Sequence, residues 1–191
     1  MVRKKLKFIY KFIISKLFQI IYGKIVFLNQ NDNDVKIKEV NKEENNYKFI
    51  EINNGRIFTD YIEHVAVINK NQIIDFVSYQ QVKGVFKDPT FNVVIKKGTP
   101  KFKKKFNGKV FSLVQGASGN NNYFHWMFDI LPRLIILEKF YNLNDINFFY
   151  CPQIKPWQLS TLSIFNIGND KLINSNLHRH IQADKILAVS H

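Results

Sequence analysis

The chain has 191 residues, of which 46% are hydrophobic and 15% aromatic, so it can bury a sizeable apolar core. This composition excludes a disordered or fibrous protein. The single cysteine excludes an intramolecular disulfide framework and a zinc site built from several cysteines.

The positive charge is large, but it does not by itself indicate a nucleic-acid partner. The formal charge is +13, yet 24 of the 28 basic residues are Lys and only 4 are Arg, the residue best suited to bidentate contacts with phosphate and guanine. Together with the Lys, the 22 Asn and 25 Ile indicate the bias of an AT-rich genome, which raises the isoelectric point without any binding function. We therefore expect no nucleic-acid partner.

Residues 1–28 are predicted to form a basic amphipathic helix. They carry seven basic residues and no acidic one, and apolar residues recur on one helical face at spacings of 3 and 4: Leu6, Ile9, Ile13, Leu17 and Ile20. Lys11 and Lys16 interrupt the apolar run, which argues against a transmembrane span. Two interpretations stay open: a helix lying on an anionic membrane surface, or a terminal helix packing its Leu/Ile face on the domain.

Residues 29–46 are polar and are predicted to be a linker with at most one short strand. Short apolar runs follow at 47–52, 62–68 and 73–82, and we expect them to form a small antiparallel β unit. The Asn54-Gly55 pair between the first two runs predicts a hairpin. The lysine-rich segment 96–108 is predicted to be a solvated loop, with contact to a phosphate as the alternative interpretation of its lysine cluster.

From residue 110 the pattern changes to alternating strands and helices. We expect strands at 110–115, 147–151 and 185–190 and helices at 122–140 and 156–167. This βαβ progression predicts a parallel sheet, and residues 47–191 are expected to form one α/β domain. The sequence contains no Walker-type loop and no dinucleotide-binding fingerprint.

The predicted helix at 122–137 is almost entirely apolar, but four polar residues at spacings of 3, 4 and 4 interrupt it: Asn122, His125, Asp129 and Arg133. Buried polar groups are costly unless they are paired, so this stripe faces either protein partners or a cleft. In the structural interpretation Asp129 pairs with His125 and Arg133, and Asn121 or Asn122 caps the helix. In the functional one, the stripe lines a substrate site, where Asp129 holds the His125 ring or itself accepts a proton. Pro132 predicts a kink.

The segment from Gly116 to Leu137 resembles the signature helix of glycosyltransferase family 61, which includes bacterial capsular polysaccharide enzymes. Asn122, His125 and Asp129 match the family pattern N-x-x-H-x-x-x-D. Looser agreement comes from 110–115, 157–159 and 183–186, so that the resemblance covers roughly residues 55–191.

This resemblance implies an inverting glycosyltransferase of GT-B architecture, in which residues 47–191 form the Rossmann-like N-terminal half. A nucleotide-sugar is then the donor substrate, a polysaccharide or other glycan is the acceptor, no cofactor is bound covalently, and the need for a metal stays open. His125 or Asp129 is the expected catalytic base, and the expected substrate-binding residues are Gly119, Asn121, Asn122 and Arg133. Such an enzyme is expected in the cytoplasm, peripheral to the inner face of the membrane.

The chain departs from the family in one respect, because it stops at His191, where the family continues into its nucleotide-binding half. We therefore expect an N-terminal fragment that transfers no sugar by itself. A second hypothesis is a non-catalytic sugar-binding or membrane-surface module that requires a separate partner chain. A third is a basic nucleic-acid or membrane-surface protein that uses the βαβ part as a scaffold.

Three further features are assigned ordinary structural roles. His178, His180 and His191 have too few neighbouring metal ligands, and a surface loop is expected there. Cys151 ends an apolar strand and is expected to be a buried thiol. Ser118 follows Gly116-Ala117, a spacing that differs from the nucleophile elbow of hydrolases.

Overall fold

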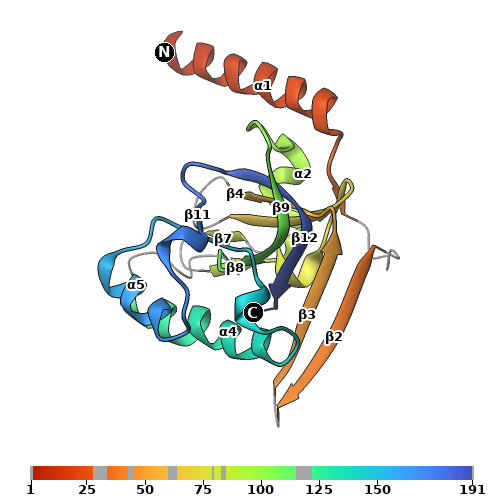
Figure 1. Ribbon diagram of the computed structural model, residues 1–191. Helices are drawn as coiled ribbons and strands as arrows, with labels where there is room; N and C mark the ends of the chain where they lie inside the picture. Colours follow the sequence, from red (N-terminus) through yellow and green to blue (C-terminus); the bar gives the residue numbers. More distant parts are fainter. Residues whose placement is uncertain are drawn as a thin grey trace.

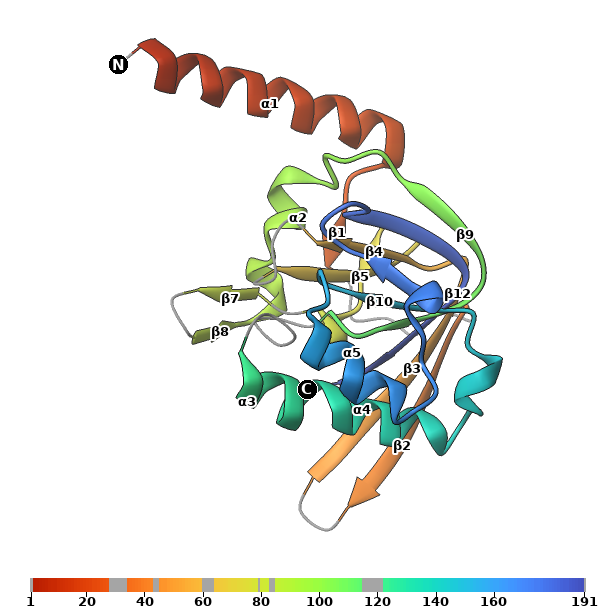
Figure 2. The ribbon, with the colours of Figure 1, turned by 60° about the vertical axis from the view of Figure 1, so that its left-hand side comes forward.

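A computed structural model describes residues 2–27, 34–42, 45–59, 64–78, 80–82, 85–114 and 122–190. Its helices are α1 (Val2–Tyr22), α2 (Val93–Lys97), α3 (Tyr123–His125), a π turn (Trp126–Ile130), α4 (Leu131–Glu138) and α5 (Pro156–Ser163). Short 3₁₀ turns lie at Asp75–Val77, Pro89–Phe91, Leu143–Asp145 and Asn169–Lys171. The helices α4 and α5 lie along one side of a large sheet, and α1 extends beyond its opposite end (Figures 1 and 2).

The large sheet has ten strands: β1 (Val26–Phe27), β2 (Val35–Lys42), β3 (Asn45–Asn53), β4 (Arg56–Thr59), β5 (Val65–Asn69), β6 (Gln72–Ile73), β9 (Lys104–Ser112), β10 (Phe148–Cys151), β11 (Leu172–Asn174) and β12 (His180–Val189). A separate two-stranded sheet pairs β7 (Gln80–Val82) with β8 (Val85–Lys87). The main order is β1-β6-β5-β4-β12-β9-β10-β11, and β3 and β2 extend from β12.

The strands β12, β9, β10 and β11 are parallel, with α4 and α5 in the connections that lead from β9 to β10 and from β10 to β11. The sequence prediction of a parallel α/β sheet is therefore confirmed for this part of the chain. The chain is a mixed α/β protein with an N-terminal helix.

The two faces of the parallel strands bury alternate residues, as the pleat requires. One face packs on the helices, and its cluster joins Phe111, Phe149 and Leu187 to Trp126 and Leu134. The other face forms a second cluster that joins strands from both parts of the sheet, including Val110, Tyr150 and Ile186 as well as Ile57 and Val67. This second cluster therefore joins the parallel and the antiparallel parts of the sheet.

The predicted hairpin at Asn54-Gly55 is wrong. β3 pairs with β12 from Phe49 to Asn53, and β4 continues along the same edge of β12 from Arg56 to Phe58, so both strands run in the same direction. Asn54, with a φ of 54°, forms an irregularity between them, where its N–H donates to the carbonyl of Asp184. An Asn-Gly pair supplies the left-handed backbone conformation, but this conformation serves a bulge as well as a hairpin turn.

Three other boundaries differ from the prediction. The expected linker at 29–46 contains β2, an eight-residue strand paired with β3 along its whole length. The expected basic loop at 96–108 contains the start of β9. The last strand begins at His180 and not at 185. The strands β4, β5 and β6 are antiparallel as expected, but they belong to the same sheet as the parallel strands and do not form a separate unit. For β2 and for the start of β9, pairing with a neighbouring strand offsets a polar local composition.

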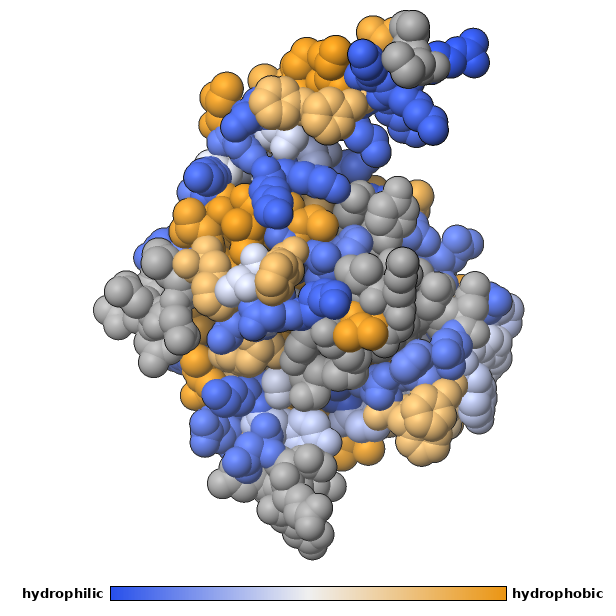
Figure 3. All heavy atoms as spheres, turned by 180° about the vertical axis from the view of Figure 1, so that it is seen from behind, coloured by the Kyte–Doolittle hydropathy of each residue, from blue (hydrophilic) through white to orange (hydrophobic). Residues whose placement is uncertain are grey.

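The helix α1 is the predicted amphipathic helix, but it does not pack its Leu/Ile face on the domain. It contacts the domain through its last two turns, where Ser15 and Gln19 donate to the carbonyls of Lys97 and Lys96, and Phe18 packs on Phe102. The Leu/Ile stripe points away and stays exposed, with Ile20 at 82%. Figure 3 shows apolar side chains gathered along this helix. Among the described residues, no helix is both long and apolar enough to cross a bilayer.

Candidate functional site

The helical segment after β9 begins at Asn122, which acts as its N-cap. The Asn122 Oδ1 atom accepts hydrogen bonds from the N–H groups of Phe124, at 3.0 Å, and His125, at 3.4 Å. These are backbone donors that an isolated helix end leaves unpaired. The predicted capping role is thus confirmed for Asn122.

A π turn at Trp126–Ile130 interrupts the helix directly before Pro132. The N–H of Leu131 donates to the carbonyl of Trp126, five residues back, in place of the usual four. Pro132 carries no N–H and its ring crowds the preceding turn, so the wider turn accommodates it. The predicted disturbance at Pro132 thus takes the form of a π turn, a feature often found at functional sites.

His125 and Asp129 form a close pair on this segment. The His125 Nδ1 atom lies 2.6 Å from the Asp129 Oδ2 atom, and the two side chains are 32% and 22% exposed. Because the carboxylate can only accept, we assign the proton to Nδ1, which leaves the lone pair of the neutral ring on Nε2. The Nε2 atom has no hydrogen-bond partner among the described residues. Of the two roles expected for Asp129, this geometry favours holding the ring.

Three exposed aromatic side chains lie on the same segment as the pair, and one of them, Phe124, contacts the His125 ring at 5.9 Å between centroids. Tyr123, Phe124 and Phe128 are each more than 60% exposed, and the rings of Phe124 and Phe128 lie 4.8 Å apart. Tyr123 also contacts Trp157 of α5, at 5.5 Å between ring centroids. Exposed aromatic rings gathered in one place favour ligand binding, because the hydrophobic effect disfavours their contact with water.

The opposite side of the helix is fixed to α5. Trp126 is fully buried, and its indole N–H donates to Thr161 Oγ1 at 2.8 Å. The Thr161 hydroxyl in turn donates to the carbonyl of Gln158 at 2.7 Å. His125 therefore lies on a rigid element, as precise placement of a reactive group requires.

A pocket of about 310 Å³ lies at the carboxyl ends of β10 and β11. Its lining includes Cys151, Gln153, Asn169 and Asn174. The helix that carries His125 follows the carboxyl end of β9, so the pocket and the His125–Asp129 pair belong to the same edge of the parallel strands. Ligands of open α/β sheets bind at this edge.

The structure brings together only part of the predicted substrate-binding set. Asn122, His125 and Asp129 occupy consecutive turns of one segment, whereas Arg133 is buried, with 3% of its surface exposed. Gly119 and Asn121 lie outside the described residues, as does Ser118.

The exposed aromatic residues were not predicted. The sequence signal that could have revealed them is the apolar character of nearly every position from 123 to 137. A helix that covers one face of a sheet cannot bury all of its sides, so some of these positions must face water.

The remaining predictions concern His180 and Cys151. The surface loop expected at His178, His180 and His191 is present at His178, which is partly exposed before β12, while His191 lies outside the described residues. It is wrong for His180, which is buried in β12: its ring packs on Tyr22 and Phe58, and burial lowers its pKa to about 3. Cys151 is buried as predicted, and burial raises the pKa of its thiol to about 12, so it is not a reactive thiolate. The described residues contain no cluster of three or more His, Cys, Asp or Glu side chains arranged to hold a metal ion.

Comparisons of the chain with protein-family models, with curated proteins and with solved structures find no match. The resemblance to glycosyltransferase family 61 therefore rests on the sequence pattern described above and has no support from these comparisons.

Proposed function

We propose that this chain supplies the acceptor side of an inverting, nucleotide-sugar-dependent glycosyltransferase of surface or capsular polysaccharide synthesis. The observation that carries the proposal is the His125–Asp129 pair, in which the carboxylate orients the ring and leaves Nε2 without a partner among the described residues. This pair lies on the segment that carries the family resemblance, and it is the arrangement that a general base requires.

His125 is the proposed base. In an inverting transfer the acceptor hydroxyl oxygen attacks the anomeric carbon, and the bond from that carbon to the nucleoside diphosphate breaks with its electron pair on the leaving oxygen. The Nε2 atom of His125 takes the hydroxyl proton as the new bond forms. Asp129 then stabilises the resulting imidazolium, as the buried aspartate does in a catalytic triad.

The surroundings of the pair support a glycan as the ligand. Sugar rings have apolar C–H faces that pack on exposed aromatic rings such as Phe124 and Phe128. Their hydroxyl groups need amide partners, and the pocket at the carboxyl ends of β10 and β11 supplies Gln153, Asn169 and Asn174.

The order of the parallel strands supports assigning the α/β part of the chain to the Rossmann-like half of a GT-B enzyme. The order β12-β9-β10-β11, with helical connections that follow β9 and β10, is what a Rossmann-like half of a GT-B enzyme contains. We therefore propose this architecture for the α/β part of the chain.

Binding to an array of defined oligosaccharides tests the proposal. Wild-type chain is expected to bind at least one glycan, and Phe128→Ala is expected to weaken that binding about tenfold, because the substitution removes an aromatic contact. Phe91→Ala is the matched control, since Phe91 is equally exposed but lies in the turn before α2. Equal losses in the two variants, or no bound glycan, would contradict the proposal.

A membrane-surface module is the second candidate, and the free face of α1 favours it. The helix leaves its Leu/Ile stripe exposed, and residues 1–28 carry seven basic residues and no acidic one. Such a helix binds anionic bilayers through apolar burial and charge together. The two candidates are compatible, because a polysaccharide enzyme that works on a membrane-bound acceptor needs such an attachment.

A further inference from the structure

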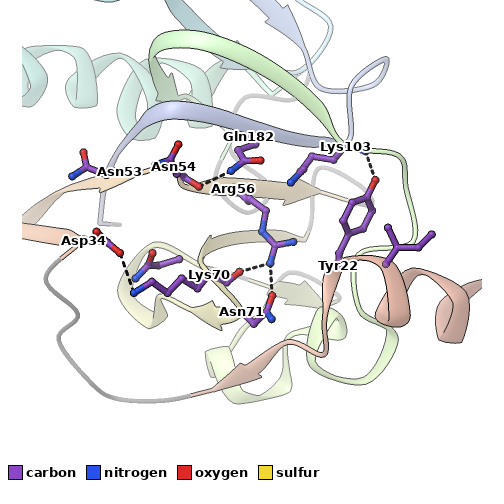
Figure 4. Close-up of a pocket in the computed structure, with 11 residues that line it drawn as sticks. Tyr22, Asp34, Asn53, Asn54, Arg56, Lys70, Asn71, Lys103 and Gln182 are labelled. Atoms are coloured by element: carbon purple, nitrogen blue, oxygen red, sulfur yellow. Dashed lines mark hydrogen bonds and ion pairs between the residues drawn. The ribbon is translucent and has the colours of Figure 1, made fainter.

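A polar pocket of about 430 Å³ lies where the end of α1 meets β4 and the β5–β6 turn (Figure 4). It is far from the His125–Asp129 pair, because α1 and the α3–α4 segment lie at opposite ends of the molecule (Figures 1 and 2). Of its eleven lining residues, ten have polar side chains and only Ile21 is apolar. This lining excludes an apolar ligand.

Arg56 lines the pocket, and the described residues provide no counter-ion for it. It is 5% exposed, and its Nη2 atom donates to the carbonyl of Lys70 and, at 2.9 Å, to Asn71 Oδ1. Both acceptors are neutral, and no carboxylate among the described residues pairs with the guanidinium. Burial lowers the pKa of Arg56. A buried charge that lacks an opposite charge is costly, and an anionic ligand would remove that cost.

Lys103 adds a second positive charge beside Arg56. Figure 4 shows both side chains directed into the same pocket. The Lys103 ammonium lies 5.4 Å from the centre of the Tyr22 ring, and no carboxylate among the described residues pairs with it. Burial lowers the pKa of Lys103, and repulsion from Arg56 and Lys105 lowers it further. The pocket thus has a positive potential that its own residues do not neutralise.

Tyr22 offers a hydrogen-bond donor to the same space. Its hydroxyl oxygen accepts from the backbone N–H of Lys103 at 3.0 Å. The hydroxyl hydrogen has no acceptor among the described residues, so it is available to a ligand oxygen.

The charges of the pocket match one class of anion. Among the described lining residues, Arg56, Lys70 and Lys103 are positive and Asp34, which pairs with Lys70 at 3.0 Å, is negative, so these residues carry a net charge of two positive units. A phosphomonoester carries about −1.5 to −2 charges at pH 7 and has three acceptor oxygens. A carboxylate offers half that charge and a flat pair of oxygens.

We propose that this pocket binds a phosphomonoester, with Arg56, Lys103 and Tyr22 on the phosphate oxygens. The volume leaves room for the group that carries the phosphate, and the amide side chains of Asn53, Asn54 and Gln182, which also line the pocket, can bind its hydroxyl groups. The phosphate belongs either to a soluble sugar phosphate or to the headgroup of a lipid such as phosphatidic acid, which α1 would bring to the pocket.

Calorimetric titration with glucose 6-phosphate, and with glucose as the uncharged control, tests the soluble source. Wild-type chain is expected to bind the phosphate ester and not glucose. Lys103→Gln is expected to weaken binding tenfold or more, because it removes a charge-assisted contact. Lys104→Gln is the matched control: it makes the same charge change at the exposed neighbouring residue and is expected to leave binding unchanged.

Flotation with phosphatidic acid vesicles, compared with phosphatidylglycerol vesicles of equal total charge, tests the lipid source. If the wild-type chain prefers phosphatidic acid, and Lys103→Gln abolishes this preference while Lys104→Gln preserves it, the result supports a lipid headgroup as the ligand of the pocket. Binding of neither phosphomonoester, or equal losses in the two variants, would overturn the proposal. Failure here leaves the glycan-binding proposal intact, because the two sites share no residue.

Discussion

The Nδ1 atom of His125 lies 2.6 Å from the Oδ2 atom of Asp129, one turn further along the same helical segment. The segment is fixed from behind by Trp126 and opens on its other side to exposed aromatic rings. This relationship makes His125 the base in the proposed reaction and gives Asp129 a positioning role.

Asp129→Asn is expected to reverse the tautomer of His125. An amide can donate a hydrogen bond to Nδ1, which moves the ring proton to Nε2 and removes the lone pair that the proposed reaction needs. Nitrogen-15 NMR of the imidazole rings reads the protonated nitrogen directly. When the chain is combined with a separate chain that supplies the nucleotide-binding half, the same variant is expected to lower the kcat of sugar transfer by a factor of about 10² to 10⁴. An unchanged tautomer would show that Asp129 does not orient the ring.

Asn122→Ala is expected to reduce the free energy of unfolding by about 1 kcal/mol, because the helix loses its N-cap. Urea denaturation measures the difference. Asn144→Ala is a suitable control, since the described contacts of Asn144 use only its backbone. Similar stability of the two variants would show that the cap contributes little.

The fold of the C-terminal part could be predicted because its strands are buried on both faces and read as short apolar runs, as 147–151 does. β2 could not be predicted, because an edge strand needs few apolar residues and its stability comes from pairing with β3. The role of Asn54-Gly55 could not be predicted either, since only the partner strand β12 distinguishes a bulge from a hairpin.

The candidate sites likewise divide into one that could be predicted from the sequence and one that could not. The His125–Asp129 pair was predictable, because both residues lie on one helix at a spacing of four. The phosphate pocket was not, because Tyr22, Arg56 and Lys103 are far apart in the sequence and only the tertiary fold brings them together. Within the sequence, Lys103 is one lysine of the cluster at 96–108, for which a solvated loop was favoured and a phosphate contact was the alternative.

Ile13→Glu is expected to weaken binding to vesicles that contain phosphatidylglycerol by about tenfold or more. Ile13 lies in the middle of the exposed stripe of α1, and burial of such a side chain contributes about 1.5–3 kcal/mol. Liposome flotation measures the loss. Ile164→Glu makes the same change at an exposed isoleucine next to α5 and serves as the control. If both variants float as the wild type does, α1 is not a membrane-binding element.

The buried His180 predicts a stability that depends on pH. Burial lowers its pKa in the folded protein to about 3, below the 6.5 of an unfolded chain, so the unfolded state binds a proton that the folded state does not. The contribution of His180 is therefore fully present above pH 6.5 and is lost as the pH falls towards 3, by up to about 1.4 kcal/mol per pH unit.

Urea denaturation between pH 7 and pH 4 tests this dependence. His180→Phe is expected to flatten it, because phenylalanine preserves the contacts with Tyr22 and Phe58 and cannot bind a proton. His178→Asn is the control, since His178 is only partly buried, and it should retain the slope of the wild type. An equally steep slope in His180→Phe would assign the effect to another group.

The most direct test of the proposed function is nitrogen-15 NMR of the histidine rings during titration with an oligosaccharide that the chain binds. We expect the Nε2 signal of His125 to shift with the occupancy of the glycan, while the signals of the buried His180 stay in place. A glycan that saturates the chain and leaves the Nε2 signal of His125 unchanged would contradict the assignment of His125 to the acceptor site.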